Sequence, residues 1–489
     1  MGARTGREYL EALDRTTREL WYGDEKITRD VSKHPAFRSI AHTMAELYDM
    51  QHRPDMVDVM TYVSPSSGER VGMSFLQPKT KEDLLRRMGM MKAWADYSGG
   101  TLGRTPDYLN GALMAMAAAS SFFGKGTVDF AQNVRDYYEY VRENDLLLTH
   151  TLVNPQVNRG VGPANQSDPF IAVRIVEKTQ DGVLVRGARM LATMPMADEL
   201  LVSPSTVLRT GQDDLPYAMS FALPVGTKGL RMICRETVSE DSHYDHPLAS
   251  RFDEQDAVVV FDDVLVPWKR VFLLEDPERA NRFNEATNAV VYMTQQATVR
   301  EVAKGEFLLG LVTLLAETIG VDQFPQVQEK IAEAMMTVET MKALLNSSTA
   351  NGRLNEWGLF APDFAPLNTA RNLWPRVAPS LVTVVKQIGA SGLIAMPPEK
   401  TMGSPIRPDV DKYYQSKLAD ADARIRLFKL AWDVTGSSFG GRQELYERFF
   451  FGDPVRMASA YYNWYDKEPY RQRVRQFLSR GDGPRSGSE

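Results

Sequence analysis

The sequence contains a single cysteine, Cys234, among its 489 residues. One thiol excludes an intrachain disulfide and is typical of a protein in the reducing cytoplasm, where we expect this one to work. The N-terminus, MGARTGREYL, lacks the apolar core of a signal peptide. No uninterrupted apolar run reaches the roughly 18 residues that a membrane-spanning helix needs, so no membrane segment is predicted.

An excess of positive charge is also absent. The chain has 57 Lys and Arg against 63 Asp and Glu, which gives a formal net charge of -6. Because nucleic-acid-binding proteins carry basic patches, this balance predicts no nucleic-acid partner. The 43% hydrophobic and 25% charged residues are ordinary for a globular protein.

Several motifs of common enzyme classes are missing. There is no G-x-G-x-x-G or G-x-x-x-x-G-K-[ST] pattern, which leaves Rossmann and P-loop nucleotide sites without support, and no G-x-S-x-G elbow. Among the six histidines only His243 and His246 are close in sequence, within a run that is typical of an exposed loop. We therefore predict no metal site.

Periodicity divides the chain into three regions. Residues 1–145 predict a helical domain, with capping boxes at Thr5–Glu8 and Thr80–Asp83. Residues 146–272 contain short runs of β-branched and aromatic residues between Gly, Pro and Asp, which predict a barrel or sandwich of six to eight strands. A hairpin is expected at Asp181-Gly182.

The third region, residues 273–479, predicts a four-helix bundle. Long helical periodicity covers 285–320, 325–350, 366–395 and 410–436. The polar tail, 480–489, is expected to be disordered. The predicted fold class is therefore α+β and mostly α, in the order helical domain, β-domain, helical bundle.

Two side chains at a predicted helix start could bind an anion or a phenolic oxygen. Thr105-Pro106-Asp107 is a helix start, with Arg104 just before it and Tyr108 in the first turn. A guanidinium and a phenol at the positive end of a helix suit such a ligand. The alternative is that Arg104 is a surface cation and Tyr108 packs in the core.

A second candidate group surrounds His150. It lies within an apolar strand-like run that begins at Leu146, and Gln156, Asn158 and Arg159 follow soon after. Taken by itself, His150 is better explained as a satisfied core histidine. The polar residues that follow favour a ligand, because buried polar clusters need partners. An imidazole, two amides and a cation could hold a polar planar ring and manage a proton on it.

Six segments make the chain resemble a known family, the oxygenase components of 4-hydroxyphenylacetate 3-monooxygenase within the two-component phenol and chlorophenol hydroxylases. The resemblance runs from Arg4 to about Leu478. The segments are GRTPDYLN (103–110), THTLVNPQVNR (149–159), RGARMLATMPMADE (186–199), FDDVLVPWKRVF (261–272), QIGASGL (387–393) and RQELYERFFFGDPVRM (442–457).

The resemblance implies an acyl-CoA dehydrogenase-like fold and a division of labour between two proteins. A separate reductase uses NADH to make reduced FAD. The oxygenase component combines reduced FAD with O2, through a flavin C4a-hydroperoxide, and hydroxylates a phenol ortho to its OH. The cofactor carries the oxygen chemistry, and the protein supplies position, dryness and proton control. A homotetramer is implied, with FAD held between the β-domain and the bundle of a neighbouring subunit.

The resemblance also implies roles for individual residues, matched position by position. Arg104, Tyr108 and His150 would surround the phenolic oxygen and act in catalysis, and Ser205 and Thr206 would hold the carboxylate end of the substrate. Residues implied to contact FAD are Gln156, Val157, Asn158, Arg159, Thr193, Gln387, Gly389, Asp453, Pro454, Val455 and Arg456.

The expected substrate is 4-hydroxyphenylacetate, giving 3,4-dihydroxyphenylacetate, because Ser205-Thr206 favours a carboxylate-bearing phenol. The same chemistry on phenol, a halophenol or a tyrosine derivative remains open. A flavoenzyme of the acyl-CoA dehydrogenase type is a second alternative, although we can assign no catalytic carboxylate for it. An interaction scaffold would leave Arg104, His150 and Arg159 unexplained.

Overall fold

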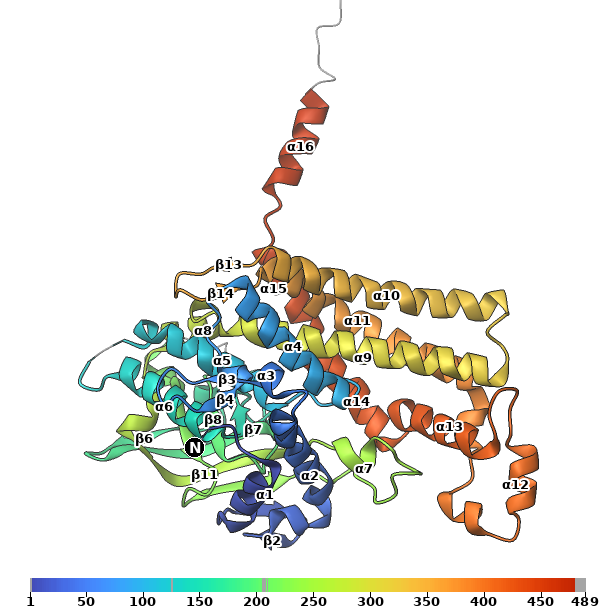
Figure 1. Cartoon of the computed structure of the whole chain (residues 1–489). Helices are drawn as coiled ribbons and strands as arrows, with labels where there is room; N and C mark the ends of the chain where they lie inside the picture. Colours follow the sequence, from blue (N-terminus) through green and yellow to red (C-terminus); the bar gives the residue numbers. More distant parts are fainter. Residues whose placement is uncertain (1, 125, 205–207, 209, 480–489) are drawn as a thin grey trace, which may run out of the picture.

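The computed structural model describes residues 2–124, 126–204, 208 and 210–479. A helical region, a β region and a second helical region follow one another along the chain (Figure 1). The α+β, mostly α class is thus confirmed, in the order that the acyl-CoA dehydrogenase-like fold implied. The expected disorder of residues 480–489 concerns a segment outside the described residues.

The first region contains both predicted capping boxes. Thr5 and Glu8 cap α1, and Thr80 and Asp83 cap α4, with both reciprocal hydrogen bonds present in each. The helices are α1 (Gly6–Arg15), α2 (Pro35–Asp49), α3 (Val57–Met60), α4 (Lys81–Tyr97), α5 (Pro106–Ala118) and α6 (Phe130–Asn144).

The prediction of a wholly helical first region is wrong in one respect. Its described residues also form β1 (Leu20–Tyr22), β2 (Glu25–Ile27), β3 (Thr61–Val63) and β4 (Arg70–Gly72). β1 pairs in parallel with a strand more than 200 residues away, so the β-structure draws on the N-terminal segment. The domain boundaries at 145 and 272 stay predictions.

The β region forms two sheets that share a core. Eight strands lie in its described part, at the upper end of the predicted number: β5 (Leu148–Thr151), β6 (Arg174–Lys178), β7 (Gly182–Thr193), β8 (Glu199–Val202), β9 (Met219–Pro224), β10 (Leu230–Cys234), β11 (Asp256–Pro267) and β12 (Val271–Leu274). One sheet has the order β2-β1-β10-β11-β7-β6 and the other β12-β9-β8-β5. Phe221 and Phe261 meet edge to face between them, with ring centroids 6.0 Å apart.

The expected hairpin joins β6 to β7, shifted by one residue. The Thr179 N–H donates to the Gly182 carbonyl, so the two-residue loop is Gln180-Asp181 rather than Asp181-Gly182. Gly182 instead begins β7 and lies opposite Pro267 of β11, where an added Cβ would come within 2.1 Å of the Val266 carbonyl oxygen. Only glycine fits so close to a neighbouring backbone.

Three of the four predicted long helices are present in the C-terminal region, whereas the fourth, 410–436, is divided into two helices, α12 (Arg407–Tyr413) and α13 (Ala421–Thr435). α9 (Ala289–Ile319), α10 (Pro325–Ala350) and α11 (Phe364–Gly389) pack on one another, and α13 packs on α11 (Figure 1). The remaining elements are α7 (Ala249–Phe252), which precedes β11, α8 (Pro277–Ala286), β13 (Arg353–Leu354), β14 (Phe360–Ala361), α14 (Ser438–Phe449), α15 (Pro454–Trp464) and α16 (Glu468–Ser479).

One segment, Phe364–Ile394, is long and apolar enough by length and composition to cross a membrane. It contains α11, which packs against α9, α10, α13, α14 and α15. A core helix of a bundle passes the same test, and this packing identifies α11 as such a helix.

Helix α5 is held in place by the bundle. It packs along α9, and its first turn is fixed by a buried polar contact. The Thr105 hydroxyl donates to Asp107 at 2.5 Å instead of capping a backbone N–H, and the Gln296 amide of α9 donates to the same carboxylate oxygen at 3.3 Å. Burial raises the pKa of Asp107 to about 6. The start of α5 therefore cannot shift without breaking these bonds.

Candidate active site

The fold brings Arg104, Tyr108 and His150 together, as predicted. The Arg104 guanidinium carbon lies 4.2 Å from the centre of the Tyr108 ring, and the Tyr108 and His150 rings are 6.0 Å apart. Arg104 and Tyr108 come from the start of α5, and His150 comes from β5, which contacts α5. The roles of the three residues stay predictions.

His150 is held neutral. Burial, and then the charge of Arg104, lower its pKa to about 3. Within the described ranges neither ring nitrogen has a hydrogen-bond partner, although β5 itself is bonded along its length to β8. A neutral imidazole without a described partner can accept a hydrogen bond from a ligand.

Arg104 is a cation held by aromatic rings rather than by a carboxylate. Its guanidinium carbon lies 4.2 Å from the ring centres of both Tyr108 and Phe450. No described carboxylate forms an ion pair with the guanidinium, and its buried Nε has no partner there either. Burial lowers the pKa of Arg104, but Tyr446, Tyr108 and Glu254 outweigh it and raise the pKa. The Arg104 guanidinium is therefore free to bind an anionic or phenolic ligand.

The residues implied to contact the flavin ring form an exposed strip after β5. Gln156, Val157, Asn158 and Arg159 are all exposed, and the side chain of Val157 is 61% accessible. Within this loop the Oδ1 atom of Asn154 is buried and finds no partner among the described residues. The strip offers amide groups, and the neighbouring Asn154 Oδ1 is an acceptor without a described partner, so both could bind a polar planar ring.

Thr193 is tied to the His150 strand from one side and to a carboxylate from the other. The Thr149 hydroxyl, next to His150, donates to the Thr193 carbonyl at 2.5 Å. The Thr193 hydroxyl donates to Asp256 Oδ1 at 2.8 Å. The end of β7 thus lies in the same region as His150.

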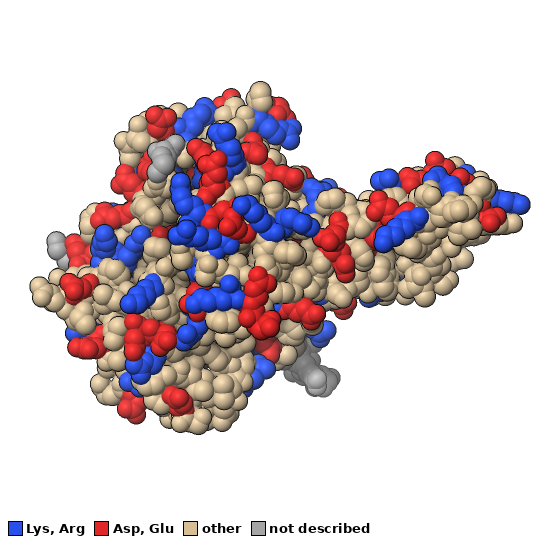
Figure 2. All heavy atoms as spheres, turned by 90° about the horizontal axis from the view of Figure 1, so that it is seen from below, with Lys and Arg blue, Asp and Glu red and all other residues tan. Residues whose placement is uncertain are grey.

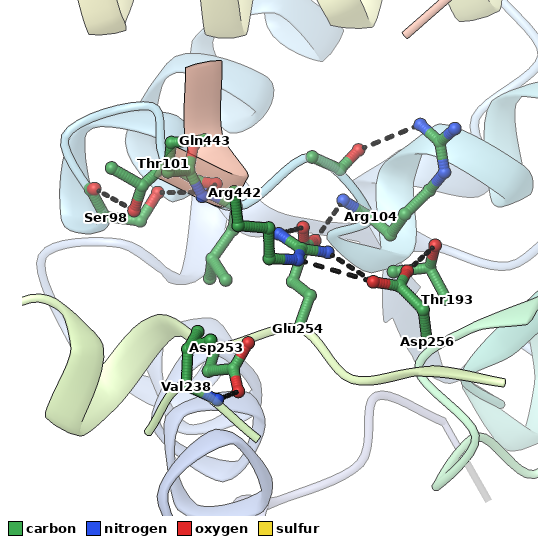
Figure 3. Close-up of polar contacts among 12 residues, drawn as sticks. Ser98, Thr101, Arg104, Thr193, Val238, Asp253, Glu254, Asp256, Arg442 and Gln443 are labelled. Carbon is green, nitrogen blue, oxygen red and sulfur yellow. Dashed lines mark hydrogen bonds and ion pairs between the residues drawn. The ribbon is translucent and has the colours of Figure 1, made fainter. Parts of the chain in front are cut away.

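A polar network, drawn in Figure 3, links this region to the bundle. Arg442 of α14 lies between Glu254 and Asp256 and forms ion pairs of 3.7 Å and 3.0 Å with them. Glu254 Oε1 accepts the backbone N–H of Arg104 at 2.6 Å.

Some predicted residues lie further from this cluster, and others are outside the described residues. Ser205 and Thr206 are outside the described residues, so the carboxylate end of the substrate stays a prediction. Gln387 and Gly389 end α11, and no described contact joins them to Arg104, Tyr108 or His150.

The predicted FAD segment Asp453–Arg456 begins α15. Asp453 caps this helix by accepting the N–H groups of Val455 and Arg456. The preceding residues include Phe450, which packs on Arg104, so this segment begins close to the cluster.

Glu254, Asp256, Arg442, Tyr446 and Phe450 are site residues that the sequence did not reveal. Arg442, Tyr446 and Phe450 recur every four residues, which places them on one face of a helix, and this spacing could have identified them. Glu254 and Asp256 carry no such signal. No group of metal-ligating side chains occurs in the part of the chain that the structure describes.

Comparisons with known proteins agree with this geometry. Residues 5–273 match the family model of the 4-hydroxyphenylacetate 3-hydroxylase N-terminal region, and residues 280–479 match that of the C-terminal region. The oxygenase component of 4-hydroxyphenylacetate 3-monooxygenase from Thermus thermophilus is 51% identical over 477 residues, 97% of each chain. The corresponding protein from Geobacillus sp. is 45% identical, covering 98% of this chain and 97% of its own.

The similarity extends to solved structures. A crystal structure of such an oxygenase component, complexed with FAD and 4-hydroxyphenylacetate, superimposes with a TM-score of 0.94 at 51% sequence identity. It covers 98% of this chain and 99% of its own. Two family models, full-length relatives and a shared structure lead to one conclusion: this chain belongs to the 4-hydroxyphenylacetate 3-hydroxylase family of flavin-dependent monooxygenases.

Proposed function

We propose that this chain is the oxygenase component of a two-component monooxygenase that converts 4-hydroxyphenylacetate to 3,4-dihydroxyphenylacetate with reduced FAD and O2. The observation that carries the proposal is the cluster of a fixed cation, Arg104, a phenol, Tyr108, and a neutral imidazole, His150. The names of relatives that share nearly the whole chain support the same substrate and cofactor.

The cluster can prepare a phenol for attack on its ring. A phenol has an ordinary pKa of about 10, so at neutral pH its ring is a weak nucleophile. Arg104 favours the phenolate by its charge, and neutral His150 can accept the phenolic O–H as a hydrogen bond and take its proton once the phenolate stabilises the imidazolium. The carbons ortho and para to the oxygen then gain electron density, and because the para carbon carries the acetate group, the ortho carbon is the one open to hydroxylation.

FAD suits the residues of this chain. The exposed strip Gln156–Arg159 and the unpartnered Asn154 Oδ1 would hold the flavin ring, and Thr193 would lie at its reactive edge. Reduced FAD supplies, when bound, the electrons that activate O2 for transfer of one oxygen atom. Asp453 to Arg456, with Gln387 and Gly389, would complete the site.

The proposal requires a separate flavin reductase, since no nicotinamide-binding motif occurs in the sequence. The purified chain should form 3,4-dihydroxyphenylacetate from NADH, FAD and O2 only when a reductase is added. The assay measures hydroxylated product over a panel of 4-hydroxyphenylacetate, phenol, 4-chlorophenol and tyrosine. Rapid NADH oxidation without a reductase would contradict the two-component assignment. A preference for another phenol would make that phenol the substrate in place of 4-hydroxyphenylacetate.

An assembly of several copies is part of the proposal. α16 extends away from the body of the molecule (Figure 1) and contains no buried residue. Tyr470, Val474, Phe477 and Leu478 form an apolar stripe along it, between 55% and 76% exposed. An exposed apolar stripe of this kind is usually covered by a partner. We propose that the partner is a second copy of the chain, within a homotetramer.

Among its described residues, the face drawn in Figure 2 offers no charged patch for a nucleic acid or an anionic membrane. Figure 2 shows acidic and basic side chains interspersed on one face, without a broad region of one sign. We place the enzyme in the cytoplasm, in agreement with its single cysteine.

Replacing Val474 and Phe477 together with aspartate should shift the protein to smaller species, because charge on the stripe opposes burial. Sedimentation velocity measures the shift. Gln472→Asp, on the opposite side of the same helix, is the control and should leave the assembly intact. A wild-type protein that sediments as an active monomer would exclude the assembly.

A further inference from the structure

Arg442 joins two parts of the site that lie on separate elements. It is on α14 of the bundle, whereas its partners Glu254 and Asp256 lie two residues apart at the start of β11 (Figure 3). The next residue, Gln443, donates to the Thr101 carbonyl at 3.0 Å and so ties α14 to the segment just before Arg104.

One branch of the network leads to the substrate side. Glu254 is fully buried, and its Oε1 accepts the Arg104 N–H. Its other oxygen forms no hydrogen bond among the described residues and faces Arg442 at 3.7 Å. Arg442 is therefore the cation that compensates the carboxylate holding the Arg104 backbone.

The second branch leads to the flavin side. Asp256 forms ion pairs with Arg442 at 3.0 Å and with Arg235 at 2.9 Å, and it accepts a hydrogen bond from the Thr193 hydroxyl at 2.8 Å. Burial raises the pKa of Asp256, but Arg442 and Arg235 outweigh it and lower the pKa. Asp256 stays ionised and can only accept, so the Thr193 hydroxyl must donate to it, and its orientation is fixed.

We propose that Arg442 is a positioning residue that holds Arg104 through Glu254 and Thr193 through Asp256, and so aligns the substrate and flavin sides of the site from one point in the bundle. This inference rests on the proposed function. It assigns separate effects to the two branches, whereas a merely structural network would weaken both sides together.

Three variants test the assignment: Glu254→Gln, Asp256→Asn and Arg442→Met. We measure the Kd of reduced FAD under anaerobic conditions, the Kd of 4-hydroxyphenylacetate at saturating reduced FAD, and the Tm. Glu254→Gln should raise the Kd of the phenol about tenfold and the Kd of reduced FAD less than about twofold. Asp256→Asn should raise the Kd of reduced FAD about tenfold and the Kd of the phenol less than about twofold. Arg442→Met should weaken both about tenfold.

Two matched controls separate position from charge. Arg448→Met removes an exposed arginine from the same helix, and Asp263→Asn removes a carboxylate of β11 that pairs with the exposed Arg186. Both should leave the two constants unchanged. Arg442→Lys keeps the charge without the planar fork and should restore part of each affinity. If Arg442→Met does not fold, the Glu254 and Asp256 variants still test the inference, because it expects them to weaken different ligands.

Two results would overturn the inference. One is an Arg442→Met protein that keeps both constants within about twofold of wild type. The other is a Glu254→Gln and an Asp256→Asn protein that each weaken both ligands together, in step with Tm. If the wild type itself bound no reduced FAD, the proposed function would fall, and the inference with it.

Discussion

Replacing His150 with alanine should lower hydroxylation on the order of 100-fold while the flavin is still oxidised, so that reducing equivalents are released as hydrogen peroxide. The burial of His150 and the charge of Arg104 keep its imidazole neutral, with a pKa of about 3. It can therefore accept a hydrogen bond from the phenolic OH, and the phenolate that forms beside it would stabilise the imidazolium and let it take the proton. Without His150 the ring of the substrate stays a weak nucleophile, so hydrogen peroxide is released faster than oxygen is transferred to the ring.

The pH dependence of this variant distinguishes a base from a structural histidine. Because the folded pKa of His150 lies near 3, the wild-type imidazole stays neutral as pH falls through the ordinary histidine value of about 6.5, and coupling should not change there. The variant should instead recover activity as pH rises toward the phenol pKa of about 10, since solvent then removes the proton.

The measurement is product formed per NADH consumed, across pH, with a reductase present. His42→Ala, at an exposed position of α2, is the control and should behave as wild type. Wild-type coupling in the His150 variant at neutral pH would make His150 a structural residue only.

Replacing Arg104 with alanine should reduce hydroxylation far more than it reduces the binding of reduced FAD. A lost charge-assisted hydrogen bond costs about 1.5–3 kcal/mol, which corresponds to roughly 10- to 150-fold in substrate or transition-state binding. The guanidinium packs against the rings of Tyr108 and Phe450 without a carboxylate partner among the described residues, so its charge remains available to the phenolic oxygen.

Arg104→Lys distinguishes charge from shape. Lysine keeps the positive charge but has no planar group to pack against the aromatic rings, so we expect it to recover only part of the activity. The assay is kcat/KM for the phenol beside the Kd of reduced FAD. Equal losses of the two in Arg104→Ala would instead place Arg104 on the cofactor.

Much of the local structure could be predicted from the sequence, because it depends on neighbours along the chain. The capping boxes of α1 and α4 follow from residues three positions apart, and the long helices follow from a regular apolar period. The family, too, could be identified from motifs in a fixed order.

Contacts between distant segments were decided only by the tertiary structure. β1 joins β10 across more than 200 residues, and Arg442 meets Asp256 across 186. Glu254 and Asp256 have no periodic signal that separates them from the other carboxylates of the chain. Their place in the site arises because α14 brings Arg442 to the start of β11, and local periodicity contains no information about which distant segments meet.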